Sequence, residues 1–367
     1  MIKYLGSKRT LVPVLGRLCA AAGAGTALDL FTGTTRVAQE FSRQGAYVTA
    51  VDTAAYSEVF GRCYLETDPA TVDRAALEDA IATLDALPGV DGYVTETYCR
   101  QSRYFQPANG RRIDAIRQAI EDRWADSPLW PILLTSLVEA ADRVDSTVGL
   151  QMAFLKDWSP RSYRPLELRI PDLLPGAGRM IRADVATTVR DLAPVDLAYL
   201  DPPYNQHRYY TNYHVWETLV RWDAPATYGV ACKRLDCRDE ATKSAFNRRR
   251  QMPAALAEVI GAVRAGVVAV SINDESFVSR DQVVEMCRAR GGRVEVLAFD
   301  ARRYIGSVIG VFDPQGRRVG RPGARSTTEF IVLAGDPDRV GAMVAAAGGP
   351  AGTSAGESRD TAAATEV

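Results

Sequence analysis

The sequence predicts an α/β protein with a mostly parallel sheet and an inserted helical subdomain. An apolar run at 27–31 leads into a turn containing Gly33, a stretch with helical spacing at 36–45, and a second apolar run at 47–52. Strand, turn, helix and strand in this order form a βαβ unit. Five further apolar runs predict strands that complete a sheet of seven, at 180–185, 195–200, 267–274, 294–299 and 329–335. The last two flank a Gly- and Arg-rich segment and are expected to pair antiparallel at the sheet edge.

A long helical stretch separates the two groups of predicted strands. Helical periodicity is present at 74–87, 111–124 and 128–143. Connections in α/β units usually have about two to six residues, so this stretch is an inserted subdomain and not a loop. We expect residues 1–65 and 179–345 to form one discontinuous domain around an insert at 66–178. The Ala-, Gly-, Ser- and Thr-rich tail at 346–367 is expected to be disordered.

The composition limits the class of protein. With 367 residues and 47% hydrophobic residues, the chain can bury a sizeable core. It contains no apolar run of about eighteen residues, and its N-terminal sequence lacks the apolar stretch of a signal peptide, so we expect a cytoplasmic protein without a membrane partner. A net charge of −1 argues against a protein that coats nucleic acid with a uniformly basic surface, but it allows a single basic face.

Cysteine and histidine do not follow a metal-binding pattern. The six cysteines include no C-x-x-C pair, and the two histidines are His207 and His214. A cluster of Cys232, Cys237 and one histidine is conceivable, but we expect no metal site. The two histidines and Glu217 form no recognisable triad, and we expect them to shape a pocket or a loop.

The strongest motif is VDLAYLDPPYN, an apolar strand that ends in Asp201-Pro202-Pro203-Tyr204. Ligands of open α/β sheets bind beyond the carboxyl ends of the strands. The prolines fix the backbone and lack N–H groups, so the Pro202 carbonyl is held rigidly. Asp201 offers a second acceptor and Tyr204 an aromatic face. A plain strand followed by a proline turn is the alternative.

These groups suit the exocyclic amino group of adenine. The lone pair of adenine N6 is delocalised into the ring, so N6 is a poor nucleophile. Two acceptors aimed at its hydrogens would shift electron density onto the nitrogen, and an aromatic side chain would stack on a base flipped out of a duplex.

Three segments together resemble the Dam-type family of DNA adenine-N6 methyltransferases, which includes modification enzymes of restriction systems. They are IKYLGSKR (2–9), LDLFTGTTRVA (28–38) and DPPYNQHRYYTNYHVWETL (201–219), in the family's order and on either side of the insert. The resemblance implies a Rossmann-like methyltransferase sheet, S-adenosylmethionine as cofactor, and double-stranded DNA as partner. It also implies that the insert recognises the target sequence. A cognate restriction endonuclease is a possible companion, and nothing in the sequence indicates an obligate protein partner.

The first-strand motif is a candidate cofactor site. Gly33 allows a ligand to approach the backbone closely. Asp29 lies where it could accept a hydrogen bond from the amino group of the cofactor's methionine part, and Phe31 and Thr32 would line that side. The motif departs from G-x-G because position 31 is Phe, which argues against a nicotinamide cofactor.

Four more residues are assigned to the cofactor. Asp52 ends the second strand, where an acidic residue typically accepts hydrogen bonds from ribose hydroxyls; the alternative is a helix N-cap. The resemblance implies that Asp184 contacts the adenine ring of the cofactor, with a turn aspartate as the alternative. It also places Tyr4 against the cofactor and Lys8 near the cofactor carboxylate or the target pocket, where a cation would match a carboxylate.

Basic residues gather in particular stretches, which are candidates for DNA contact. At 97–117 the arginines are interleaved with Tyr98, Tyr104 and Phe105, and a second basic stretch spans 232–250. Arginines can bind phosphates or guanine edges, and aromatic rings can stack on bases. The alternative is a solvated charged face. The candidate DNA-binding residues are Arg100, Arg103, Arg111, Arg112, Lys233, Arg248 and Arg249, and a third stretch adds Lys156, Arg161 and Arg164.

Two alternative functions stay open at this point. One is an amino methyltransferase acting on cytosine N4, on RNA or on a protein glutamine. The resemblance disfavours it, since cytosine-N4 enzymes more often have Ser at the position of Asp201, and glutamine methylases usually have Asn. The other is a DNA-binding relative without turnover, which the intact Asp29, Gly33, Asp52 and Asp201 disfavour.

Overall fold

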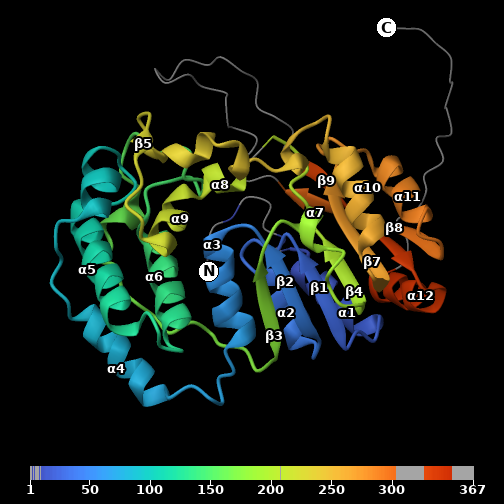
Figure 1. Ribbon diagram of the computed structural model, residues 1–367, viewed down its shortest axis with the longest axis horizontal. Helices are drawn as coiled ribbons and strands as arrows, with labels where there is room; N and C mark the ends of the chain where they lie inside the picture. The colour runs from blue at the N-terminus through green and yellow to red at the C-terminus, as the bar shows by residue number, and fades with distance from the viewer. Residues whose placement is uncertain are drawn as a thin grey trace, which may run out of the picture.

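The computed structural model describes residues 2, 4, 8, 10–206, 208–302 and 326–348. It has two parts that lie side by side in Figure 1, a sheet with its covering helices and a group of helices around α4, α5 and α6. The Gly- and Arg-rich segment at 303–325 and all but the first three residues of the predicted tail at 346–367 lie outside the described residues. No helix within the described ranges is long and apolar enough to cross a membrane.

The central sheet has seven strands in the order β3-β2-β1-β4-β7-β9-β8. Strands β3, β2, β1, β4 and β7 are parallel, whereas β9 is antiparallel to both β7 and β8. The predicted sheet and the antiparallel pair at its edge are therefore confirmed. The strands are β1 (Thr26–Leu30), β2 (Tyr47–Asp52), β3 (Gly178–Arg182), β4 (Val195–Leu200), β7 (Ala265–Asn273), β8 (Arg293–Arg302) and β9 (Ser326–Gly335).

The strand order reverses between β1 and β4, and this reversal places the site. From β1 the chain runs outward through β2 to β3, and it then returns to add β4 on the other side of β1. In such a sheet, ligands bind outside the carboxyl ends of the strands at this reversal. Leu30 pairs with Leu200 at those ends, so the segments that follow β1 and β4 lie next to each other.

Helices cover both faces of the sheet because successive strand residues point to opposite sides. Leu197 and Tyr199 of β4 pack with α1, α2 and α12, whereas Ala198 and Leu200 pack with α7, α10 and α11. The first three helices are α1 (Val12–Ala21), α2 (Arg36–Arg43) and α12 (Pro337–Ala346). The other three are α7 (Val185–Thr188), α10 (Met252–Ala262) and α11 (Arg280–Arg288).

The insert contains the three predicted helices. They are α4 (Arg74–Asp85), α5 (Pro107–Trp124) and α6 (Trp130–Val144), with π-helical turns at Arg62–Glu66 and Thr95–Arg100 and a 3₁₀ turn at Pro160–Tyr163. Helix α5 begins four residues before the predicted start, because Pro107 suits the first turn of a helix even though no apolar periodicity precedes it.

The insert shares its hydrophobic core with helices of the sheet domain. One cluster joins α4, α5 and α6 to α3 (Ala55–Gly61), which precedes the insert, and to α9 (His214–Arg221), which follows the DPPY motif. Between β4 and α10 the chain also forms α8 (Tyr209–Asn212), a β5–β6 ribbon (Thr227–Tyr228 and Lys233–Arg234), and 3₁₀ turns at Leu235–Arg238, Glu240–Thr242 and Ala245–Asn247. The sequence predicted neither the β5–β6 ribbon nor the hydrophobic core that the insert shares with α3 and α9.

Candidate active site

The turn after β1 is unusually tight. Phe31, Gly33 and Thr35 have positive φ values of 68°, 55° and 60°, and the amides of Phe31 and Thr32 both donate to the carbonyl of Val51 on β2. A left-handed backbone at Phe31 is strained for a bulky residue, as is common at functional sites. Phe31 thus has a left-handed backbone at a position where the common motif has glycine.

Gly33 sits beneath Tyr4. A Cβ atom at Gly33 would lie 3.0 Å from the Tyr4 ring, so glycine is needed for this contact as well as for the turn. Tyr4 in turn stacks on Tyr213, with ring centroids 4.5 Å apart, and its hydroxyl lies 3.2 Å from the Tyr56 hydroxyl. The N-terminal motif and the first-strand motif are therefore held together at one wall of a cavity.

Asp29 is a buried carboxylate at the end of β1. It is 1% exposed, and it accepts hydrogen bonds from the Thr32 hydroxyl at 2.6 Å and the Ala38 amide at 3.0 Å. Burial raises the pKa of Asp29 to about 7, although these two hydrogen bonds favour the ionised form. A cation bound beside Asp29 would restore its charge.

Asp52 and Asp184 end the next two strands and hold the local backbone. Asp52 accepts from the Gly33 amide at 2.9 Å and the Ala54 amide at 3.0 Å, and burial raises its pKa. Asp184 accepts from the Ala186 amide at 2.8 Å and caps α7. The alternative of a helix N-cap does not hold for Asp52, because the N-cap of α3 is Ala54, whereas Asp184 does cap the turn of α7. Both side chains also line the cavity.

Asp201 follows β4 and faces a buried lysine. The Lys8 Nζ lies 3.1 Å from Asp201 Oδ1 and 3.0 Å from Glu329 Oε2. Burial raises the pKa of Asp201 to about 6, the Lys8 ammonium opposes this rise, and the charge of Glu329 adds to it. Lys8 thus contacts the DPPY motif.

The remaining residues of the DPPY motif differ in accessibility. Pro203 lines the cavity with Asp201, but Pro202 and Tyr204 do not. Tyr204 is 8% exposed, and its hydroxyl accepts a hydrogen bond from Asn273 Nδ2 at 3.2 Å. Lys8 Nζ lies 5.4 Å from the centroid of the Tyr204 ring. The Tyr204 ring is therefore covered in this structure and is not an open stacking surface.

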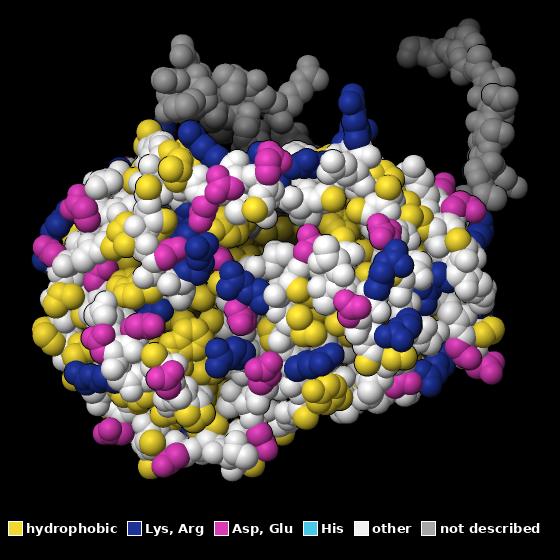
Figure 2. Space-filling view, in the orientation of Figure 1, with side chains coloured by type: hydrophobic (Ala, Val, Ile, Leu, Met, Phe, Trp, Pro, Cys, Tyr) yellow, Lys and Arg dark blue, Asp and Glu magenta, His cyan; other side chains and the backbone are white. Residues whose placement is uncertain are grey.

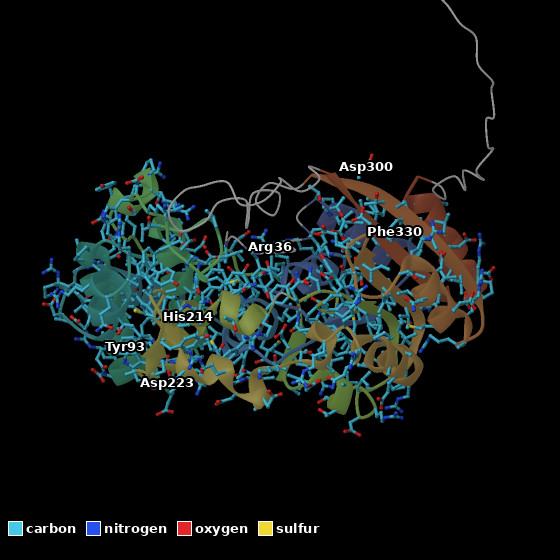
Figure 3. The ribbon with its side chains drawn as sticks, turned by 90° about the horizontal axis from the view of Figure 1, so that it is seen from above. Arg36, Tyr93, His214, Asp223, Asp300 and Phe330 are labelled. Carbon is cyan, nitrogen blue, oxygen red and sulfur yellow. The ribbon has the colours of Figure 1, made fainter. Side chains whose placement is uncertain are left out.

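One cavity brings these groups together. It has an empty volume of about 1080 Å³, which includes the solvent at its opening. All eight residues assigned to the cofactor line it, together with Asp201 and Pro203. Figure 3 labels Arg36, which also lines it, between the helical part with Tyr93 and His214 and the β8–β9 side with Asp300 and Phe330. The sequence indicated no role for several other lining residues. Four of them lie within the quoted motifs, namely Arg36, Arg208, Tyr209 and Tyr210, and four lie outside them, namely Tyr56, Thr242, Ser244 and Asn247.

The histidine and the glutamate that follow DPPY have structural contacts. Burial lowers the pKa of His214 to about 3, and its Nε2 lies 2.9 Å from the carbonyl of Gln151. Glu217 accepts the Ala55 amide at 3.0 Å and so joins α9 to α3. His207 lies outside the described residues. Within the described ranges, no group of three or more His, Cys, Asp or Glu side chains is arranged to hold a metal ion.

The basic stretch at 97–117 is largely part of the helical core. Its aromatic residues Tyr98, Tyr104 and Phe105 are at most 1% exposed, so the expectation that they stack on bases is wrong for this structure. Arg112 donates to the carbonyls of Asp85 and Leu87 at 2.7 and 2.6 Å and thereby joins α5 to the end of α4.

The other three candidate DNA-binding arginines of this stretch also have partners. Arg100 pairs with Asp91 at 2.7 Å and with Glu96 at 3.3 Å, and Arg111 lies 3.9 Å from Asp91. Arg103 lies over the Trp158 ring, 5.1 Å from its centroid. None of the four arginines lines the cavity.

The second basic stretch reaches the cavity. Arg248 and Arg249 directly follow Asn247, which lines the cavity wall. Arg248 pairs with Glu240, and Arg249 lies 5.9 Å from the Phe277 ring centroid. Lys233 is half-buried on β6. In the view of Figure 2, basic and acidic side chains are interspersed, so charge alone does not single out a DNA face there.

The sheet is of the methyltransferase type, and one cavity contains three carboxylates at strand ends together with the DPPY motif. These two features define the class of protein. Comparison with known proteins defines the family. The model of the D12 class N6 adenine-specific DNA methyltransferases matches residues 4–247. The chain belongs to this family, whose methyl donor is S-adenosylmethionine.

The similar proteins are methylases of restriction-modification systems. The chain is 28% identical to the type II methyltransferase M.NlaIII of Neisseria lactamica, over 75% of this chain and 83% of that one. It is 26% identical to modification methylase StsI of Streptococcus sanguinis and to modification methylase LlaI of Lactococcus lactis subsp. lactis, over 83% of this chain in each case. It spans 49% and 51% of those two proteins, about half of their length.

Proposed function

We propose that the chain transfers a methyl group from S-adenosylmethionine to N6 of an adenine that is flipped out of duplex DNA, at a specific sequence, as a modification methylase. The observation that carries this proposal is the single cavity that contains both the strand-end carboxylates and Asp201. A methyl donor bound by the carboxylates and a base bound by Asp201 would meet in this cavity, with no protein between them.

The carboxylates suit the chemical groups of the cofactor. The cofactor's ammonium group would pair with Asp29, which lies buried with a raised pKa and gains a counter-charge when a cation binds. Asp52 would accept hydrogen bonds from ribose hydroxyls, and Asp184 would contact the adenine ring. The same cofactor-binding site would be lined by Tyr4, Phe31, Thr32 and Gly33. When bound, the cofactor supplies an activated methyl group.

Asp201 and the Pro202 carbonyl would accept the two N6 hydrogens of the target base, which aims the nitrogen lone pair at the methyl group. The methyl group would pass to N6 in one in-line displacement, S-adenosylhomocysteine would be the leaving group, and water would take the surplus proton. Tyr204 would stack on the base, which requires its ring to lose its present cover as the base enters. Lys8 balances the charge of Asp201 throughout.

The DNA face that we propose adjoins the cavity. The Tyr104 hydroxyl lies within hydrogen-bond distance of the carbonyls of Gln151, at 2.5 Å, and of Ala231, at 3.0 Å. The loop before the 3₁₀ turn at Pro160–Tyr163 and the turn of the β5–β6 ribbon are therefore side by side. The ribbon turn exposes Val230 at 81% and the loop exposes Met152 at 40%. With Lys156, Lys233, Arg248 and Arg249, these two segments supply apolar tips among basic groups, which suits a bent or opened duplex.

We further propose that the substrate is chromosomal or phage DNA in a bacterial-type cytosol. The names of the relatives support a role beside a restriction endonuclease, which would be a separate protein.

The role of Asp201 gives the first test. Replacement of Asp201 by Ala should lower the single-turnover rate of methyl transfer by about 10²–10³, as for other preorganised polar groups at a reacting centre. Cofactor binding, measured by calorimetry, should be retained. A transfer rate close to that of the wild type would refute the assignment.

A further inference from the structure

Glu329 is a buried acidic residue that no motif indicates. It lies on β9 directly opposite Asn273 of β7, two strands away from the DPPY strand β4. Its Oε2 lies 3.0 Å from Lys8 Nζ, and its Oε1 lies 3.5 Å from Asn273 Nδ2. Asn273 Nδ2 also donates to the Tyr204 hydroxyl. Glu329 is thus linked to both ends of the DPPY motif, to Asp201 through Lys8 and to Tyr204 through Asn273.

Water screens the charges of this cluster only in part. The side chains of Lys8 and Glu329 are 6% and 12% exposed, and that of Asp201 is 20% exposed. Ion pairs at such sites are held firmly only when each charge keeps its partners, because an uncompensated buried ion is costly. Without Glu329, the Lys8 ammonium would keep only one carboxylate partner, Asp201. Lys8 and Asp201 would then be less firmly fixed in position.

We propose that Glu329 is a positioning residue for methyl transfer, which holds the Lys8 ammonium at the place from which it contacts Asp201. This inference rests on the function proposed above. Two carboxylates against one ammonium leave the cluster with a net negative charge when all three are ionised. Positive charge develops on N6 as the new bond forms, and a preorganised negative cluster stabilises it.

The arrangement predicts a particular pH dependence. Asp201 must be ionised to accept the N6 hydrogens, so the rate falls at low pH as Asp201 becomes protonated. The charged and titratable groups around Asp201 are Lys8, Glu329 on β9, Asp29 on β1, Tyr199 on β4, Tyr204 and Tyr209 on α8. Of these, Glu329 raises the pKa of Asp201 and Lys8 lowers it. Loss of the Glu329 charge therefore lowers that pKa and moves the acid limb of the profile to lower pH.

The test is the pH profile of single-turnover transfer by Glu329→Gln, with S-adenosylmethionine and duplex DNA saturating at every pH. We expect the plateau rate to fall by about tenfold or more, below the loss for Asp201 itself. We expect the midpoint of the acid limb to fall by about half a pH unit or more, the effect of one nearby charge. An unchanged plateau, or a midpoint that stays or rises, would overturn the proposal.

Two further variants separate positioning from a fold defect. Glu295→Gln is the matched control, because Glu295 lies on β8, pairs with Arg293 and does not line the cavity, so plateau and midpoint should stay as in the wild type. Glu329→Asp keeps the charge but shortens the side chain, so the plateau should fall while the midpoint stays near that of the wild type. A wild-type plateau for Glu329→Asp would count against positioning by Glu329. If the wild-type protein itself methylates no adenine, the proposed function fails first, and calorimetry of cofactor binding distinguishes that case.

Discussion

Each carboxylate at the cofactor end of the cavity also fixes the backbone around it. Asp29 accepts the amide of Ala38, Asp52 those of Gly33 and Ala54, and Asp184 that of Ala186. A substitution at any of these residues therefore removes backbone hydrogen bonds as well as the proposed contact with the cofactor. The resulting change in cofactor affinity has to be compared with the effect of removing a cap far from the cavity.

Asp52 allows this comparison. Asp52→Ala should weaken S-adenosylmethionine binding about tenfold, since the ribose hydroxyls lose an acceptor worth about 1–1.5 kcal/mol. DNA affinity without cofactor should be almost unchanged. Calorimetry measures both.

Asp336→Ala is the matched control for removal of a cap. Asp336 caps α12 by accepting the amides of Asp338 and Arg339, and it does not line the cavity. The substitution should cost about 1 kcal/mol of stability and leave cofactor affinity intact. Equal cofactor affinities for Asp52→Ala and Asp336→Ala would contradict the assignment of Asp52.

At the scale of elements, the loop that contains Gln151 and the β5–β6 ribbon are both bonded to α9. Gln151 Oε1 accepts the amides of Val215 and Trp216 in the first turn of α9, although Gln151 belongs to the insert. On the other side of α9, Arg234 of the β5–β6 ribbon is 1% exposed and pairs with both Asp223 and Asp236. The loop and the ribbon are thus rigid supports, and a duplex held by them would be fixed relative to DPPY.

The two basic stretches should therefore differ in DNA binding. The double variant Arg248→Ala/Arg249→Ala should bind duplex DNA more weakly, and the slope of log affinity against log salt should fall by up to about 2, because each arginine that no longer neutralises a phosphate lowers the slope by about one. Titrations at several salt concentrations on target and random duplexes measure the slope. A parallel fall on both duplexes indicates that the arginines bind phosphates, and weaker discrimination between the duplexes indicates that they bind bases.

Arg100→Ala/Arg111→Ala is the comparison for the first stretch. Both arginines pair with Asp91 on the helical part and do not line the cavity, so this variant should keep the wild-type affinity and slope. If this variant lost affinity and slope while Arg248→Ala/Arg249→Ala kept them, DNA recognition would be assigned to residues 97–117 instead.

At the scale of the whole molecule, the site arises where strand order reverses, and this explains which parts of it the sequence predicts. Asp29, Asp52 and Asp201 lie at or directly after the ends of apolar strands, so sequence position alone brings them to one sheet edge. Glu329 and Asn273 could not be predicted, because they reach DPPY through an antiparallel pairing across strands far apart in the chain.

In the helical part, the sequence predicts the helices but not the environment of their side chains. Its helices follow from periodicity, but Tyr104 and Arg112 lie in a stretch whose composition resembles a DNA-binding surface. Tyr104 is buried and Arg112 binds backbone carbonyls, and both facts depend on tertiary packing. Composition alone does not predict tertiary packing.

The most direct measurement concerns the product. The protein is incubated with unmethylated duplex DNA and S-adenosylmethionine labelled in its methyl group, and the DNA is then digested to nucleosides for mass spectrometry. The roles proposed for Asp201 and the Pro202 carbonyl predict label in N6-methyladenine, at a defined sequence. Label confined to N4-methylcytosine, or no label in DNA under conditions where calorimetry shows that the cofactor is bound, would contradict the account.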